Sequence, residues 1–227
     1  MSLSFEKLDV PEMFLEHCIN CHLDVIMMKL LTFRKPTEET LRKFLNHQAT
    51  CDFSYKAVGA TAHVPPNGYV VDRTRVELGV GEAVFQAAKS ALQSWEHFRL
   101  GWVDVWPSRT PLLQGEVVAI IGRMLGIYSL NSCRIAYTVE ESQPIVRYGY
   151  AYGTLPGHIE SGEERFLIEW DLVSGKVFYD IIAFSRPNYK LVWLIYPLIR
   201  YGQKRFARDS VVSMQRAVQA GYVTARQ

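Results

Sequence analysis

Residues 147–171, RYGYAYGTLPGHIESGEERFLIEWD, decide the fold that this chain is expected to adopt. Three tyrosines alternate with glycine and alanine in the first strand, which places the rings on one face and very small residues on the other. After a turn at 154–158, Phe166, Ile168 and Trp170 share one face of a second strand. Because glycine weakens a strand, a fold keeps it where backbone or ligand comes close. The pattern predicts a curved antiparallel sheet with an aromatic concave face.

The rest of the chain supplies further strands and a few helices. Alternation of apolar and polar residues predicts strands at 69–78, 102–106, 116–124, 127–139, 145–153, 163–172 and 176–184. The spacing of apolar residues predicts helices at 11–33, 37–48, 82–95 and 188–220. Thr37 is expected to cap the second helix, and Pro197 to kink the last one. Since a sheet of this length curls, the last helix is its expected cover, which makes an α+β domain with an aromatic cavity.

Composition and charge are those of an ordinary globular protein whose basic residues gather at one end. Of the 227 residues, 48% are hydrophobic and 21% are charged, and the net charge is +2. Residues 186–227 contain eight Lys or Arg against one acid, a balance of +7, which leaves −5 for the remainder. No secretory signal and no apolar run of about 20 residues is present, and the cysteines have no framework spacing. A cytoplasmic protein is therefore expected.

Seven short blocks carry a family resemblance. They are Gly59-Ala60-Thr61, Val71-Asp72-Arg73, Leu92-x-x-Trp95-x-x-Phe98, Tyr152-Gly153-Thr154-Leu155-Pro156-Gly157-His158, Gly162-Glu163-Glu164-Arg165-Phe166, Phe184-Ser185-Arg186-Pro187 and Gln203-Lys204-Arg205-Phe206-Ala207-Arg208-Asp209-Ser210. In this order they resemble the DUF1990 family of bacteria and plants, over about Arg34 to Val218. That family is similar in turn to the START-like (SRPBCC) superfamily, the helix-grip fold of birch-pollen-allergen-type proteins.

The resemblance implies a fold, a division of the chain and a kind of ligand. The implied helix-grip fold is a curved antiparallel sheet of about six to seven strands wrapped around a long C-terminal helix. Residues 34–227 would form this single domain, and residues 1–33 a helical extension. The fold implies a cavity that binds a small hydrophobic molecule, such as a lipid, an isoprenoid or a polyketide-like compound. Because the family has no established activity, the resemblance supplies no catalytic residue.

The expected cavity needs an apolar lining with a few polar anchors, which phenol groups can supply. The residues expected to bind the ligand are Tyr128, Tyr148, Tyr150, Tyr152, Trp170, Tyr179, Leu194 and Leu198. The same aromatic residues also fit a filled core, or an outer face that packs on another chain.

An enzyme on the same scaffold is the alternative function, with His158, Glu163 and Tyr152 as the catalytic residues. A turn histidine near carboxylates can act as a general base, since their negative charge raises its pKa. Cyclase-, dehydratase- or hydrolase-like chemistry would suit these groups. In the other interpretation His158 belongs to a hairpin turn, and Glu163 and Glu164 are solvated residues at a strand end.

The last helix carries a basic stripe, because Arg200, Lys204 and Arg208 are spaced by four. Such a stripe can touch anionic lipid headgroups, which makes a membrane-peripheral or protein-interaction module the third function. The acidic balance of the sheet argues against nucleic acid as a partner. Alternatively the stripe is a solvated face, partly paired with acids of the sheet, and Arg205 beside Phe206 faces inward to an acid.

His17-Cys18-Ile19-Asn20-Cys21-His22 contains the Cys-x-x-Cys-His spacing of c-type haem attachment. No export signal accompanies it, and the segment lies outside the family resemblance. On a helix the two histidines would have to converge from nearly opposite faces to hold zinc, whereas Cys18 and Cys21 fit an apolar stripe. No metal and no cofactor are expected.

Overall fold

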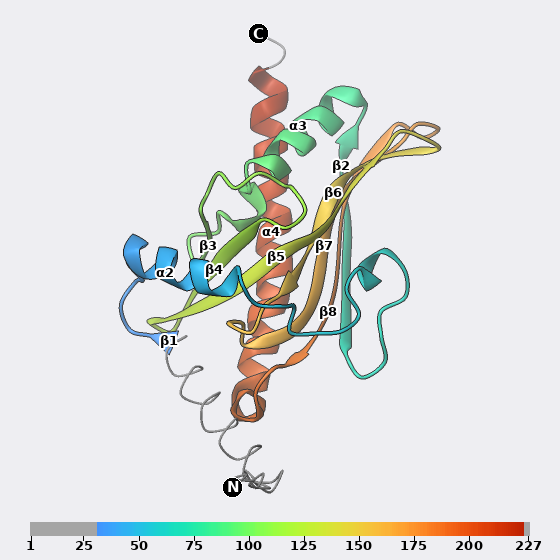
Figure 1. The fold of residues 1–227 in the computed structure, drawn as a ribbon. Coiled ribbons are helices and arrows are strands. Elements are labelled where there is room, and N and C mark those ends of the chain that lie inside the picture. The colour runs from blue at the N-terminus through green and yellow to red at the C-terminus, as the bar shows by residue number, and fades with distance from the viewer. Residues whose placement is uncertain (1–30, 225–227) are drawn as a thin grey trace, which may run out of the picture.

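The structure, a computed structural model, describes residues 31–224 of the chain. A strongly curved antiparallel sheet forms one wall, and one long helix runs along it from end to end (Figure 1). Shorter helices cover both faces of the sheet near its ends. This sheet wrapped around a terminal helix confirms the expected α+β helix-grip architecture.

The sheet is a meander with one strand added from the other direction. Its strands are β1 (Leu31–Thr32), β2 (Val70–Val80), β3 (Val103–Trp106), β4 (Val117–Met124), β5 (Ile127–Glu141), β6 (Ile145–Thr154), β7 (Glu160–Asp171) and β8 (Lys176–Pro187). The order is β2-β8-β7-β6-β5-β4-β3, and β1 pairs with β5. All seven expected strands are present. The strand β7 begins at Glu160, three residues before the expected position, because it pairs with β8 as far as Pro187.

The helices are α2 (Glu38–Gln48), α3 (Glu82–Gln93) and α4 (Tyr196–Thr224), with 3₁₀ turns η1 (Ala60–Ala62), η2 (Glu96–Phe98) and η3 (Lys190–Ile195). The Thr37 hydroxyl accepts a bond from the Thr40 N–H at 3.2 Å, so the expected cap of α2 is confirmed. Most of the predicted helix at 11–33 lies outside the described residues, and Leu31–Thr32 at its end are a strand.

Pro197 does not sit inside the last helix as expected. It occupies the first turn of α4, where its missing N–H has no helical partner to lose, and the preceding segment η3 is a 3₁₀ helix. The predicted kink is therefore replaced by a change of helix type before Tyr196.

One end of the concave face is solidly filled. Tyr150 of β6 and Phe166 of β7 are cross-strand partners with ring centroids 5.4 Å apart, and both are fully buried. Trp95 and His97 from the α3–η2 segment pack against these rings, and Met214 of α4 closes the cluster. Burial of large aromatic side chains supplies most of the stabilisation of such a core.

The glycines of β6 and β7 lie close to the protein's own atoms. A Cβ at Gly153 would overlap the phenol oxygen of Tyr55, and a Cβ at Gly162 would overlap the carbonyl oxygen of Phe184. Gly153 therefore lets the loop at 50–62 lie directly on the outer face of the sheet.

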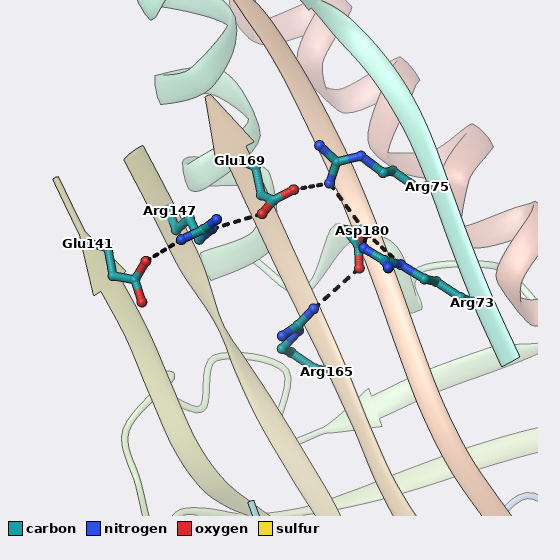
Figure 2. A network of polar contacts seen from close by, with 7 residues as sticks. All are labelled: Arg73, Arg75, Glu141, Arg147, Arg165, Glu169 and Asp180. Carbon is teal, nitrogen blue, oxygen red and sulfur yellow. Dashed lines mark hydrogen bonds and ion pairs between the residues drawn. The ribbon is translucent and has the colours of Figure 1, made fainter. Parts of the chain in front are cut away.

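The convex face carries a network of charged side chains (Figure 2). Asp180 of β8 is fully buried and accepts bonds from arginines on two neighbouring strands, Arg73 at 2.7 Å and Arg165 at 3.5 Å. Arg75 joins Asp180 to Glu169, and Arg147 and Glu141 extend the network from Glu169 across β6 to β5. Asp180, Glu169 and Glu141 are thus each paired with arginines along the strands.

Candidate functional site

A cavity of about 700 Å³ lies between the inner face of the sheet and the middle of α4. This volume is within the range of about 300–1,000 Å³ that small-molecule sites occupy. Its apolar wall includes Val76, Phe98, Trp102, Ile120, Ile181 and Phe206. The exposed side chains of Lys204, Arg208 and Val212 border it on the solvent side of α4.

Small residues create this space. Gly162 of β7, Ala183 of β8, and Gly202 and Ala207 of α4 all line the cavity. At the filled end of the same face the corresponding positions are Phe166, Tyr179 and Met214. The cavity thus lies where small side chains replace large ones along these three elements.

Strand alternation places a carboxylate, Glu164, inside the cavity. On β7 the residues 160, 162, 164 and 166 share the inner face, whereas Glu163 and Arg165 point outward. Glu164 Oε2 accepts a bond of 2.7 Å from the hydroxyl of Tyr152, its cross-strand partner. Burial raises the pKa of Glu164 to about 7, against the opposing effect of the Tyr152 bond. This carboxyl group is therefore poised to gain or lose a proton near neutral pH.

A second inner carboxylate, Glu160, connects the sheet to α4. Its Oε1 accepts bonds from Ser185 Oγ at 3.1 Å and from Gln203 Nε2 at 2.6 Å. Burial raises its pKa to about 7, although these bonds and the charge of Arg200 act in the opposite direction. Arg200 in turn forms two bonds with Asp72 of β2, at 2.5 and 2.7 Å.

His158 borders the cavity, but its electrostatics differ from the expectation. Its Nδ1 accepts a bond of 2.9 Å from the Glu160 N–H, so the neutral ring carries its proton on Nε2. Burial lowers its pKa to about 4, whereas a rise was expected from nearby carboxylates. The prediction of a raised pKa was wrong because burial removes solvent from the ring, which disfavours its charged form.

Glu163, the other acid predicted for catalysis, directs its carboxylate away from the cavity. It accepts four hydrogen bonds, from Tyr55 Oη, the Gly59 N–H, and both the N–H and the hydroxyl of Thr61, at 2.6–2.9 Å. Its side chain anchors the 54–62 segment on the outer face and is only 2% exposed. The interpretation of Glu163 and Glu164 as solvated strand-end residues was therefore wrong.

The tyrosines predicted to bind a ligand occupy different parts of the inner face. Tyr152 lies in the cavity wall. Tyr150 and Tyr179 are fully buried in the filled end, where Tyr179 bonds Ser210 at 3.0 Å. Tyr148 bonds Gln93 of α3, and Trp170 stacks on Phe85 of the same helix at 5.8 Å. Direct contact with a ligand stays a prediction, and Tyr152 has the placement that suits it best.

Three other predicted ligand-binding residues lie outside the cavity wall. Tyr128 packs on the outer face, beside the cluster that α2 forms with β4 and β5. Leu194 and Leu198 are 78% and 40% exposed near the start of α4. Their predicted role assumed that this side of the last helix faces the sheet, whereas the inward face of α4 runs through Ile199, Gln203 and Phe206.

Several residues of the cavity wall are absent from the predicted site. Glu164 had a usable signal, because it shares its parity on β7 with Phe166 and Ile168 of the inner face. Gln203 and Asp72 had no such signal, because their roles depend on contacts between distant segments. Gln203 bonds Glu160, and Asp72 bonds Arg200, which is 128 residues away in the chain.

The basic stripe on α4 is interrupted. Arg200 is paired with Asp72, and Arg208 is exposed but bonds Asp209 at 3.2 Å. Arg205 pairs with Asp209 on its own helix and lies over the ring of Trp102 at 4.3 Å. Lys204 is exposed. A contact with anionic membranes through the remaining cations stays a prediction.

No helix within residues 31–224 is long and apolar enough to cross a membrane. Within that part of the chain, no group of three His, Cys, Asp or Glu side chains is arranged to hold a metal ion. The Cys18-x-x-Cys21-His22 motif lies outside the described residues.

Comparison with known proteins identifies the family. The family model described as a domain of unknown function, DUF1990, matches residues 54–213. A UPF0548 protein of Dictyostelium discoideum is 36% identical over 207 residues, which cover 83% of this chain and 96% of that protein. A UPF0548 protein of Arabidopsis thaliana is 31% identical, with 85% of this chain and all of that protein covered. The chain belongs to the DUF1990 family.

Two solved structures show a distant likeness in fold. The crystal structure of Ara h 8.0201 aligns with a TM-score of 0.43 at 10% identity, over 67% of this chain and 99% of that one. The crystal structure of human STARD10 aligns with a TM-score of 0.42 at 10% identity, over 82% of this chain and 81% of that one.

Proposed function

We propose that this protein binds a small hydrophobic molecule, such as a lipid, an isoprenoid or a polyketide-like compound, in the cavity between the sheet and α4. The observation that carries the proposal is the cavity itself, about 700 Å³ with a mostly apolar wall and a few convergent polar groups. A concave apolar space with a few placed polar groups is the usual form of a small-molecule site.

The wall explains where the affinity would come from. Each 100 Å² of apolar ligand surface moved out of water contributes about 2.5 kcal/mol before the costs of association. Phe98, Trp102 and Phe206 offer ring faces, and Ile120 and Ile181 offer aliphatic contacts. The polar groups Tyr152 and Glu164 would fix the orientation of the bound molecule.

A cavity-filling substitution tests this proposal. Ala207 lines the cavity on α4, so Ala207→Phe is expected to weaken binding of the uncharged fluorescent dye N-phenyl-1-naphthylamine about tenfold or more. Gln219→Phe is the matched control, because Gln219 is exposed further along the same helix. Equal dye affinity of the wild type and both variants would contradict the proposal. Native mass spectrometry of the protein from its own host would identify any co-purifying compound.

Acid–base catalysis in the cavity is the second candidate function. It is supported by the hydrogen-bonded Tyr152–Glu164 pair, because the Glu164 pKa of about 7 suits proton transfer near neutral pH. If this function holds, Glu164→Gln abolishes turnover of a bound compound while the compound still binds. Unchanged turnover in that variant would exclude Glu164 as the acid or base.

A further inference from the structure

The interior of the cavity contains carboxylates without matching cations. Glu164 bonds only the hydroxyl of Tyr152, and Glu160 bonds Ser185 and Gln203, which are neutral. Within residues 31–224, no ion pair reaches either of these two carboxylates. A buried carboxylate with no cation is costly, and the protein's own fold leaves this cost uncompensated.

The other titratable groups around Glu164 are neutral or acidic. Burial raises the pKa of the Tyr150, Tyr152 and Tyr179 phenols and of the Cys133 thiol, so all four are uncharged at neutral pH. His158 is uncharged as well, since burial lowers its pKa to about 4. The remaining groups that act on Glu164, namely Glu160 and Asp72, are acids that raise its pKa.

The cations that line the cavity are Arg73 of β2 and Lys204 and Arg208 of α4, and Arg73 is bonded to Asp180 of the outer face. Arg200 is neutralised by two bonds to Asp72. Lys204 and Arg208 are exposed at the solvent border, where water screens their charge, and Arg208 is also bonded to Asp209. The deep part of the cavity is therefore complementary to positive charge.

We propose that the ligand is an apolar molecule that carries one protonated amine, held by the carboxylate of Glu164 and the phenol oxygen of Tyr152. This inference rests on the proposed function and specifies the ligand's polar end. The ammonium group would donate to both oxygens, and the nearby rings of Phe98 and Phe206 would add cation–π attraction. An alcohol would leave the carboxylate charge unpaired, and a carboxylate head group would repel it.

The proposal predicts a defined pH dependence. An alkylamine with a pKa near that of lysine, about 10.4, stays charged over the whole range from pH 5.5 to 8.5. Glu164, with a pKa of about 7, is mostly protonated at the lower limit and ionised at the upper limit. Affinity for the amine should therefore rise about 10- to 30-fold between these limits. Affinity for an uncharged ligand should stay level or fall.

The test compares decylamine, 1-decanol and decanoate on the full chain by displacement of the same dye, below their micellar concentrations. At pH 8, decylamine is expected to bind about 10- to 100-fold more tightly than decanol, and decanoate most weakly. Glu164→Gln should reduce the affinity for decylamine to within about threefold of the affinity for decanol, and should remove the pH dependence of decylamine binding. Tyr152→Phe should weaken decylamine more than decanol. Glu141→Gln, an exposed carboxylate on the outer face, is the matched control and should behave as the wild type.

Each outcome has one meaning. If decanol or decanoate binds as well as decylamine, the amine proposal is overturned, while binding in the cavity stands. If the amine preference survives Glu164→Gln in a variant that resists urea at least as well as the wild type, the assignment to Glu164 is wrong. If Ala207→Phe leaves the affinity for all three compounds unchanged, the proposed function itself fails.

Discussion

Glu163 and Glu164 are adjacent on β7, yet their carboxylates have opposite surroundings. Glu163 points to the outer face and accepts four hydrogen bonds from the 54–62 segment. Glu164 points into the cavity and accepts one, from Tyr152. Glu163 therefore holds a loop on the outer face, whereas Glu164 has acceptor capacity left inside the cavity.

The comparison extends to the two faces of the whole sheet. On the outer face, Asp180 and Glu169 are each paired with arginines from neighbouring strands (Figure 2). On the inner face, Glu160 and Glu164 have only neutral partners. The difference teaches that a buried acid with neither a cation nor a full set of hydrogen-bond donors marks the site better than an acid that is merely buried.

The largest change in the free energy of unfolding is expected for Glu163→Gln. The amide retains one acceptor oxygen and turns an N–H₂ group toward buried donors, so the free energy of unfolding should fall by about 3–5 kcal/mol. Urea denaturation followed by circular dichroism measures this loss. A loss below about 1 kcal/mol would mean that the 54–62 segment is held mainly by other contacts.

A smaller loss is expected for Asp180→Asn on the outer face. Asp180 is fully buried, but Arg73 is 58% and Arg75 is 36% exposed, so the arginines can return partly to water. The free energy of unfolding should fall by about 2–3 kcal/mol, mainly because of Arg165, which is 16% exposed. Glu141→Gln, at the exposed end of the network, should change it by less than about 0.5 kcal/mol. Equal effects of the two substitutions would show that burial does not set the strength of this network.

Among the three carboxylates Glu163, Asp180 and Glu164, the substitution Glu164→Gln should change the free energy of unfolding least, and with the opposite sign. The glutamate pKa is near 4.3 in an unfolded chain and about 7 in the folded protein, so folding favours the protonated form. The stability that Glu164 contributes is complete below about pH 4 and is lost as the pH rises through 7. Since Gln does not titrate, the free energy of unfolding of the variant should rise by about 1–2 kcal/mol relative to the wild type between pH 5 and pH 8. This gain is smaller than the full pKa shift implies, because part of the Glu164 side chain faces the cavity.

The pH dependence provides the control for this prediction. At pH 4.5 and below, Glu164→Gln and the wild type should unfold at similar urea concentrations, and they should separate only as the pH is raised. A loss of stability at pH 8, like that expected for Glu163→Gln, would remove the distinction between the two faces.

The strands were predicted well from the sequence, because alternation is a local pattern. The inner position of Tyr152 and the cap at Thr37 follow from neighbouring residues alone. The choice of Glu163 as the catalytic acid ignored the parity that places Glu164 beside Tyr152. The hydrogen bonds that bury Glu163 come from a segment about 100 residues earlier, which no local pattern reveals.

The position of the cavity could not be predicted in the same way. Aromatic residues on one face of β6 indicate either a filled core or the lining of a cavity. Tyr150 lies in the filled core, and Tyr152 lines the cavity. Which of the two applies depends on side-chain volumes contributed by α3, η2 and α4. Leu194 and Leu198 lie outside the cavity for a similar reason. The inward face of α4 is set by packing along the whole helix, and this packing leaves both leucines exposed.

The bonds between Arg200 and Asp72 have a kinetic consequence. They join α4 to β2 at the edge of the cavity, 128 residues apart in the chain. A molecule that passes between helix and sheet at this edge must wait until the pair opens, both on the way in and on the way out. Because the pair is closed before and after each passage, it lengthens the residence time and the loading time by the same factor and leaves the equilibrium occupancy unchanged.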